Sequence, residues 1–214
     1  MIPWLEPTAN PHFPDTASAL VEPAGLLAAG GRLDVEWLLV AYRQGIFPWF
    51  SENEPILWWC PAPRTVLYPK RFYQSKSLQK LARQQRYRIT VDQDFEAVIE
   101  ACAGDRKGQS GTWINSQVID AYIDMHEAGF AHSIECRHGD ELVGGLYGIS
   151  LGRVFFGESM FSRVANASTL CLKYRVDSGD YKMIDCQLPT GHLHSLGAIE
   201  ISREEFESAL NRWI

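Results

Sequence analysis

The amino-acid sequence predicts an α+β fold, and three observations lead to that prediction. The glycine-rich run from Val143 to Phe161 is typical of two strands joined by a tight turn at residues 151–153, because glycine within a strand marks a close approach of another backbone. Other stretches combine helix-capping residues with the apolar spacing of helices. With 214 residues, of which 46% are hydrophobic, the chain can bury a full core.

The elements follow one another in a mixed order. We expect residues 1–25, which are rich in proline, to be irregular. Asp34 is a plausible N-cap for the first helix and Gly45 a plausible stop. Strands are expected over residues 65–68, 87–91 and 131–136. Helices are expected from Ser75 or Ser77 to Arg83, over residues 94–102, and from Ser116 to the residue before Gly129. A last helix is expected after the capping box of residues 202–205.

Residues 45–63 gather three tryptophans and two phenylalanines among four prolines. Proline is excluded from central strands and helix interiors, so we expect these rings on a constrained loop surface. Some rings can close a small core, whereas others can form a platform on which a base stacks, at ~1–3 kcal/mol per base. The polar loop 104–111 lacks the pattern of a phosphate-binding loop. We expect that loop to be mobile and Trp113 to be exposed at its end.

The charge of the chain is unevenly distributed. The net charge is −6, yet the segment from Arg64 to Arg88 holds eight basic residues and no acidic one. Such a concentration can steer a polyanion to one face of an acidic protein. A solvated helix face that is basic by chance is the alternative.

The cysteines and the N-terminus bear on the cell compartment. Five cysteines lack the spacing of disulfide or metal sites, which is typical of reduced thiols. The start of the chain has no basic region followed by a long apolar run. We therefore expect a cytoplasmic protein with no membrane span, no metal and no cofactor.

Two carboxylates lie in apolar strands. Glu158 lies between two phenylalanines and a Met-Phe pair, and Asp185 follows Met183 and Ile184. An unpaired charge is costly to bury. Each residue therefore either faces solvent, as most acidic residues do, or belongs to a functional site.

Eight short motifs occur along the chain in a fixed order. They are residues 45–50 (GIFPWF), 57–59 (LWW), 112–114 (TWI), 142–148 (LVGGLYG), 157–162 (GESMFS), 166–168 (NAS), 184–187 (IDCQ) and 195–198 (SLGA). With these motifs the chain resembles the bacterial leucyl/phenylalanyl-tRNA–protein transferases, and the resemblance spans about residues 25–208.

The resemblance implies a fold, an activity and partners. We expect an N-terminal subdomain over residues 1–63 with a small α/β fold, and an acetyltransferase-like (GNAT) mixed sheet flanked by helices over residues 64–214. The implied activity moves Leu, Phe or Met from aminoacyl-tRNA to a protein whose N-terminus is Arg or Lys. This peptide bond marks the acceptor for the N-degron pathway. We expect a monomer.

The chemistry of such a transfer matches the two carboxylates. The ester of aminoacyl-tRNA is already activated, so the reaction needs a neutral amine and no covalent nucleophile. Asp185 can accept the proton of the amine, and Gln187, on the same strand face, can orient it. By resemblance these two residues are the catalytic pair. Glu158 matches the acidic residue of the acceptor site, where its charge favours a cationic N-terminal residue.

The substrate-binding residues are expected on three surfaces. The donor side chain needs an apolar pocket, for which Leu146, Phe155 and Ile184 are candidates. By resemblance, Trp49 and Trp113 surround the terminal adenosine of the donor. A basic helix is expected to bind the tRNA through Lys76, Lys80 and Arg83.

The sequence departs from the family in places and leaves other functions open. In the family this segment is usually a longer helix that opens with lysine. Here residues 169–180 are a few residues shorter and lack that opening lysine, which leaves the donor preference open. Cys136 and Arg137 stand where a small apolar residue and a tryptophan are usual. An acyl-CoA acetyltransferase would need a glycine-rich pyrophosphate turn, but residues 162–168 contain no glycine. A non-catalytic tRNA- or protein-binding module remains an alternative. A thiol enzyme using Cys186 with His192 or His194 is less favoured, because such a cysteine is usually part of a core.

Overall fold

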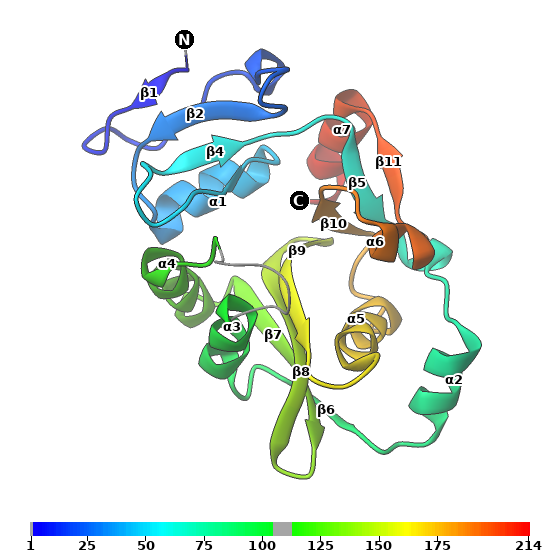
Figure 1. Cartoon of the computed structure of the whole chain (residues 1–214). Helices are drawn as coiled ribbons and strands as arrows, with labels where there is room; N and C mark the ends of the chain where they lie inside the picture. The colour runs from blue at the N-terminus through cyan, green and yellow to red at the C-terminus, as the bar shows by residue number, and fades with distance from the viewer. Residues whose placement is uncertain (1, 105–112) are drawn as a thin grey trace.

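A computed structural model describes residues 2–104 and 113–214 of the chain. Within these ranges the chain forms two sheets and seven α-helices (Figure 1). The α+β class is therefore confirmed. The mobility expected of loop 104–111 concerns residues that lie, apart from Gly104, outside the described ranges.

The first sheet is formed by the N-terminal part of the chain. It has the strand order β1-β2-β4-β3. Helix α1 (Val35–Arg43) is capped by Asp34, whose side chain accepts from the backbone N–H of Trp37, and Gly45 follows with φ of 74°. Both predicted helix ends are confirmed. The strands are β1 (Trp4–Leu5), β2 (Leu26–Gly30), β3 (Phe47–Pro48) and β4 (Leu57–Trp59).

The expected loop surface of aromatic rings is wrong for most of these residues. Phe47, Phe50 and Trp58 are buried in the core, and only Trp49, 40% exposed, is a large exposed apolar residue of this segment. The prolines permit this because β3 is an edge strand and is only two residues long. The larger gain comes from removing the rings from water.

The second sheet has seven strands in the order β11-β5-β10-β9-β8-β7-β6. The pair β9–β10 is parallel, and the other neighbouring strands are antiparallel. The expected hairpin is formed by β8 and β9, with Gly152 at φ of 54° in the turn. The strands are β5 (Arg64–Leu67), β6 (Arg88–Val91), β7 (Ala131–His138), β8 (Glu141–Leu151), β9 (Val154–Ser162), β10 (Met183–Gln187) and β11 (Ile199–Ile201).

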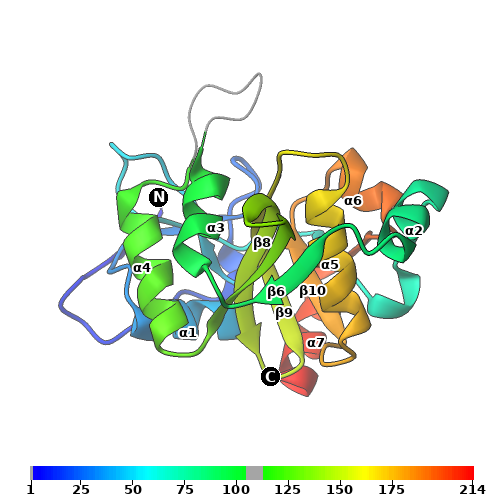
Figure 2. The ribbon, with the colours of Figure 1, turned by 90° about the horizontal axis from the view of Figure 1, so that it is seen from below.

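Helices cover both faces of this sheet (Figures 1 and 2). Helices α3 and α4 lie on one face and α5 on the other, whereas α2 packs against α5 at the periphery (Figure 2). None of the described helices is long and apolar enough to cross a membrane. The helices are α2 (Lys76–Arg83), α3 (Phe95–Ala103), α4 (Ser116–Glu127), α5 (Ala167–Asp177), α6 (Gly191–Ser195) and α7 (Arg203–Trp213).

The strands β9 and β10 separate after a short parallel contact. Their pairing extends only over Val154–Phe156 on β9, although β9 continues to Ser162 and β10 to Gln187. Each strand also carries an irregularity just beyond this contact: one extra residue lies at Glu158 in β9 and one at Cys186 in β10. A bulge re-aims side chains and is frequent beside active sites.

Gly144 tests how closely helix α5 packs on β8. A Cβ atom at this position would lie 2.4 Å from the Cβ of Ala167, so Gly144→Ala must push the helix from the sheet. We expect a loss of about 1–3 kcal/mol in the free energy of unfolding, measured by urea denaturation. Gly191→Ala is the control, because nothing lies within 4 Å of its added Cβ. Equal effects of the two substitutions would contradict this packing.

Candidate active site

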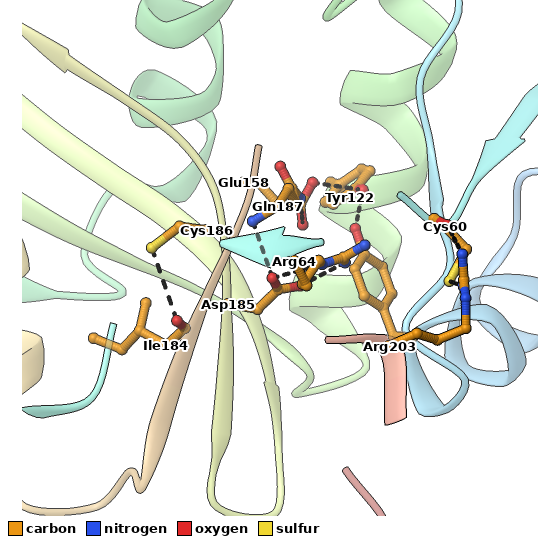
Figure 3. Close-up of polar contacts among 10 residues, drawn as sticks. Cys60, Arg64, Tyr122, Glu158, Ile184, Asp185, Cys186, Gln187 and Arg203 are labelled. Carbon is orange, nitrogen blue, oxygen red and sulfur yellow. Dashed lines mark hydrogen bonds and ion pairs between the residues drawn. The ribbon is translucent and has the colours of Figure 1, made fainter. Parts of the chain in front are cut away.

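A buried ion pair joins Arg64 of β5 to Asp185 of β10 (Figure 3). The Nε atom of Arg64 donates to Oδ1 at 2.8 Å and Nη2 donates to Oδ2 at 2.6 Å, and both residues are at most 1% exposed. The guanidinium lies between the rings of Phe47 and Phe206, at 4.8 and 4.7 Å from their centroids. Because Arg64 is buried and paired, it cannot belong to a surface that binds a polyanion. The sequence analysis counted Arg64 among the basic residues of such a surface, and that assignment is wrong.

Asp185 also fixes the end of β10. Its Oδ1 atom accepts a second hydrogen bond, at 2.9 Å, from the backbone N–H of Gln187. Gln187 has φ of 61°, a left-handed conformation that is uncommon for residues other than glycine. The bulge at Cys186 and this hydrogen bond turn the side chain of Gln187 toward β9. Its Nε2 atom donates to Oε1 of Glu158 at 2.9 Å (Figure 3).

Glu158 is buried at the bulge of β9 and accepts a further hydrogen bond from helix α4, which is supported in turn by helix α1. The hydroxyl of Tyr122 on α4 donates to Oε2 of Glu158 at 3.2 Å, and it is hydrogen-bonded in turn to the hydroxyl of Tyr42 on α1. Burial raises the pKa of both tyrosines well above the usual value of 10.0. The hydroxyls therefore stay protonated and can donate.

The proton affinity of Glu158 is unusually high for a carboxylate. Burial raises its pKa from 4.5 to about 7. The nearby hydroxyls of Tyr42 and Tyr122 and the amide of Gln187 oppose the rise, and the negative charge of Asp185 adds to it. A carboxylate with a pKa near neutrality can both accept and release a proton under physiological conditions.

An apolar pocket of about 410 Å³ opens between the separated strands β9 and β10. Leu146, Phe155 and Ile184 line it, together with Glu158 and Gln187. The structure thus brings together the residues expected for the donor side chain and two of the three expected catalytic residues. Asp185 does not line the pocket and lies directly behind Gln187.

The two tryptophans expected around an adenosine differ in position. Trp113 lines the pocket, but it is half-buried and packs against the core rather than standing exposed as expected. Trp49 does not line the pocket. It is exposed and packs against Trp59, with ring centroids 5.4 Å apart, and its carbonyl accepts from Nε1 of Trp59.

The basic helix is confirmed as a helix with an exposed basic face. Lys76, Lys80 and Arg83 are exposed on α2 and line one surface hollow, and Ser75 caps the helix. This surface is separate from the pocket between β9 and β10.

Neither thiol nor metal chemistry is supported by the described residues. Cys186 and His192 both line the pocket, but burial raises the pKa of the Cys186 thiol far above its usual value, which opposes formation of a thiolate. His194 instead approaches Glu200 on β11. Within residues 2–104 and 113–214, no group of three or more His, Cys, Asp or Glu side chains could hold a metal ion.

Sequence reasoning missed Arg64, Tyr42 and Tyr122. The two tyrosines occupy apolar positions of predicted helices, where a residue that only fills the core shows the same pattern. Arg64 had one usable signal, since it immediately precedes the strand predicted over residues 65–68 and a basic residue there needs a partner if buried. Its partner lies 121 positions away, and the sequence does not identify it.

The site as a whole is suited to acyl transfer onto an amine. It offers a proton acceptor that titrates near pH 7, an oriented amide beside it and an apolar pocket for an acyl side chain. These are the requirements of aminolysis of an activated ester, which needs an uncharged amine and a site that excludes water.

Comparison with known proteins identifies the family. Residues 66–211 match the family described as leucyl/phenylalanyl-tRNA protein transferase, and residues 31–62 match its N-terminal domain. Proteins named leucyl/phenylalanyl-tRNA–protein transferase are 54% identical in Azoarcus sp. (strain BH72), over 100% of this chain and 91% of that protein, and 54% identical in Pseudomonas fluorescens (strain Pf0-1), over 99% and 95%. The chain belongs to the leucyl/phenylalanyl-tRNA protein transferase family.

Solved structures add little to this comparison. A conserved protein of unknown function from Bacteroides thetaiotaomicron VPI-5482 is 13% identical and has a TM-score of 0.46, over 62% of this chain and 53% of that one. We draw no conclusion about the fold from this likeness.

The buried ion pair between Arg64 and Asp185 leads us to a prediction about the stability of the fold. Arg64→Met leaves the buried carboxylate of Asp185 without its partner, which we expect to cost about 3–5 kcal/mol of the free energy of unfolding. Asp185→Leu in the same chain removes that charge and should restore much of the loss. Urea denaturation of the single and double variants measures both effects. A loss below 1 kcal/mol for Arg64→Met would contradict the geometry described above.

Proposed function

We propose that this protein transfers Leu, Phe or Met from aminoacyl-tRNA to the N-terminal Arg or Lys of acceptor proteins, which forms a peptide bond and directs the acceptor to the N-degron pathway. Membership of the family supports the reaction class. The observation that carries the mechanism is the contact between Glu158 and Gln187 in the wall of the apolar pocket.

Glu158 is the proton acceptor in this mechanism. The ammonium of the acceptor gives one proton to Glu158, and the neutral amine attacks the carbonyl carbon of the ester. As the C–O bond to the ribose breaks, a second amine proton passes to the ribose oxygen. The pKa of Glu158, about 7, lies close to the ~7.7–8.0 of a free α-amine, so proton transfer costs little.

Asp185 and Gln187 act with Glu158 in different roles. The sequence favoured Asp185 as the base, but both of its oxygens are occupied by Arg64 and it is fully buried. We assign it the role of positioning Gln187 through the backbone N–H. With its Nε2 bonded to Glu158, Gln187 can accept from the attacking amine through its carbonyl oxygen.

Acceptor selection follows from the same carboxylate. An N-terminal Arg or Lys carries two positive charges, its α-ammonium and its side chain, whereas a neutral residue carries one. A carboxylate in an apolar pocket discriminates between them more strongly than one in water does.

The donor is held by the apolar pocket and by the basic helix. Leu146, Phe155 and Ile184 contact the donor side chain, and an apolar wall distinguishes one methylene by only ~1–3 kcal/mol. Acceptance of Leu, Phe and Met is therefore expected. The tryptophans at 49 and 113 stack on the terminal adenosine, and the tRNA backbone lies on α2.

The finer architecture and the location are part of this proposal. We assign the second sheet to the acetyltransferase-like (GNAT) class, supported by a mixed sheet with helices on both faces. The division between residues 1–63 and 64–214 is supported by the change of sheet between β4 and β5.

All five cysteines are free, which supports a cytoplasmic location. We also propose that the protein is a monomer.

A transfer assay tests the proposed function. Purified protein is incubated with labelled Phe-tRNA and a peptide that begins with Arg, and label in the peptide is measured against pH. We expect transfer that rises as the pH passes about 7, where Glu158 loses its proton. Glu158→Gln removes the base and should reduce kcat/KM by ~10²–10⁴-fold. Tyr122→Phe removes a donor to the carboxylate, so the rise should move to higher pH.

Controls separate the alternatives. A peptide beginning with Glu should receive no label, and ribonuclease should abolish transfer. Tyr181→Phe removes a hydroxyl that bonds Ser150 and Arg175 but not Glu158, so the pH profile should not move. Labelling from acyl-CoA without tRNA would support an acetyltransferase instead. Transfer by Glu158→Gln at the rate of the parent would eliminate Glu158 as the base.

The basic helix makes a separate prediction. Lys76→Ala with Lys80→Ala removes two exposed positive charges from α2 and should weaken tRNA binding and reduce its dependence on salt. Filter binding at two salt concentrations measures this. Arg43→Ala is the control, since this exposed basic residue lies on α1. Unchanged tRNA affinity at low salt would refute the assignment of α2.

A further inference from the structure

The segment that joins β5 to α2 lies between the pocket and the basic helix. It forms a short 3₁₀ turn over Pro69–Arg71 and then continues to the start of α2. The backbone N–H of Tyr73 donates to the carbonyl of Leu196 at 2.9 Å. Leu196 ends α6, the helix whose His192 and Leu193 line the pocket. The segment therefore rests on the end of α6 and leads from there to α2 (Figures 1 and 2).

The contact between this segment and α6 is tight. A Cβ atom at Gly197 would lie 2.1 Å from the carbonyl oxygen of Arg71 and 3.5 Å from the backbone nitrogen of Tyr73. Gly197 has φ of 96°, a conformation that favours glycine. Helix α6 has five residues and is therefore about 7.5 Å long. The backbone of Tyr73 is thus held about one short helix away from the wall of the pocket.

The ring of Tyr73 is displayed on this anchored backbone among positive charges. Tyr73 is 61% exposed. Lys70 and Arg71 precede it and Lys76 follows it, and all three are exposed. Residues 64–88 contain no acidic residue. An exposed tyrosine alone needs no explanation, but an aromatic ring among basic residues is the combination that binds single-stranded nucleic acids, because bases stack on the ring and cations neutralise the phosphates.

We propose that Tyr73 is a stacking platform for an unpaired base of the donor tRNA, next to the terminal adenosine on its 5′ side. This inference rests on the proposed function, because it takes aminoacyl-tRNA as the donor. The 3′ end of a tRNA is single-stranded. It must pass from the pocket, which holds the aminoacyl group, to α2, which binds the backbone of the tRNA. Tyr73 lies on that path.

The neighbouring charges and the ring have different roles in this site. Lys70 and Arg71 contact the phosphates beside the stacked base, which adds affinity that depends on salt. Stacking on Tyr73 accepts any base, since every base has a π-face. The site therefore strengthens binding of the donor without selecting among the tRNAs for Leu, Phe and Met.

Binding of deacylated tRNA tests this assignment without catalysis. Tyr73→Ala should weaken binding of tRNA with an intact 3′ end at least ~5-fold, whereas Tyr73→Phe keeps the ring and should bind as the parent does. The parent and Tyr73→Ala should bind equally to tRNA from which the unpaired 3′ nucleotides have been removed. Trp4→Ala is the control, because Trp4 is 60% exposed but lies on the first sheet. It should leave the affinity for both tRNAs unchanged.

Salt dependence separates the ring from the charges. Filter binding over a range of salt concentrations gives the slope of log Kd against log salt for each variant. Tyr73→Ala should lower the affinity by the same factor at every concentration, so its slope should equal that of the parent. Lys70→Ala removes a phosphate contact and should reduce the slope by about 0.7, the value for one contact to a single strand.

The possible outcomes distinguish this site from the proposed function. Unchanged affinity of Tyr73→Ala for intact tRNA would overturn the site, as would an equal loss of affinity for intact and truncated tRNA. Weaker binding of a peptide beginning with Arg, with tRNA binding intact, would also overturn it and would assign Tyr73 to the acceptor. Binding of the intact 3′ end that depends on the ring, in a protein that transfers no amino acid, would count against the proposed function and support the site.

Discussion

The bidentate ion pair between Arg64 and Asp185 is the constraint on which the rest of the site depends. It is inaccessible to water and joins β5 to β10. The rings of Phe47 and Phe206 hold the guanidinium, so the first sheet and the last helix both contribute to it. Burial of such a pair brings little net stability, and breaking it is costly. We infer that the ion pair serves to position Gln187 through Asp185 rather than to stabilise the fold.

Its consequence is the geometry of two side chains on neighbouring strands. Asp185 holds the backbone of Gln187 in a left-handed conformation, and a bulge in each strand brings Gln187 and Glu158 together. Glu158 is thereby held largely buried in the wall of the pocket and is hydrogen-bonded to donors from α4 and β10. Its raised pKa follows from burial, which the hydrogen bonds only partly offset. The N-terminal part of the chain contributes through Tyr42, which supports Tyr122.

Local features of the fold could be predicted, and long-range contacts could not. The caps at Asp34 and Ser202 and the turn at Gly152 depend on a few adjacent residues and were predicted. The cap at Ser75 was one of two candidates, the other being Ser77. The exposure of the aromatic rings in the proline-rich segment was predicted wrongly, because their burial depends on the pairing of β4 with β2, a strand from an earlier part of the chain. For the site, the residue types were found through motifs, but Asp185 was expected to face the substrate. Its partner Arg64 and the bulge at Cys186 are properties of strand pairing, which the sequence does not specify.

Glu158 binds its proton near neutral pH because the fold holds its carboxylate in a buried position. The most direct test follows the side-chain carboxyl of Glu158 by NMR in protein labelled with ¹³C at glutamate, with Glu158→Gln used to assign the signal. We expect a titration midpoint at about 7. A midpoint near the ordinary value of 4.5 would contradict it, because Glu158 would then be an ordinary carboxylate and a poor match for the amine.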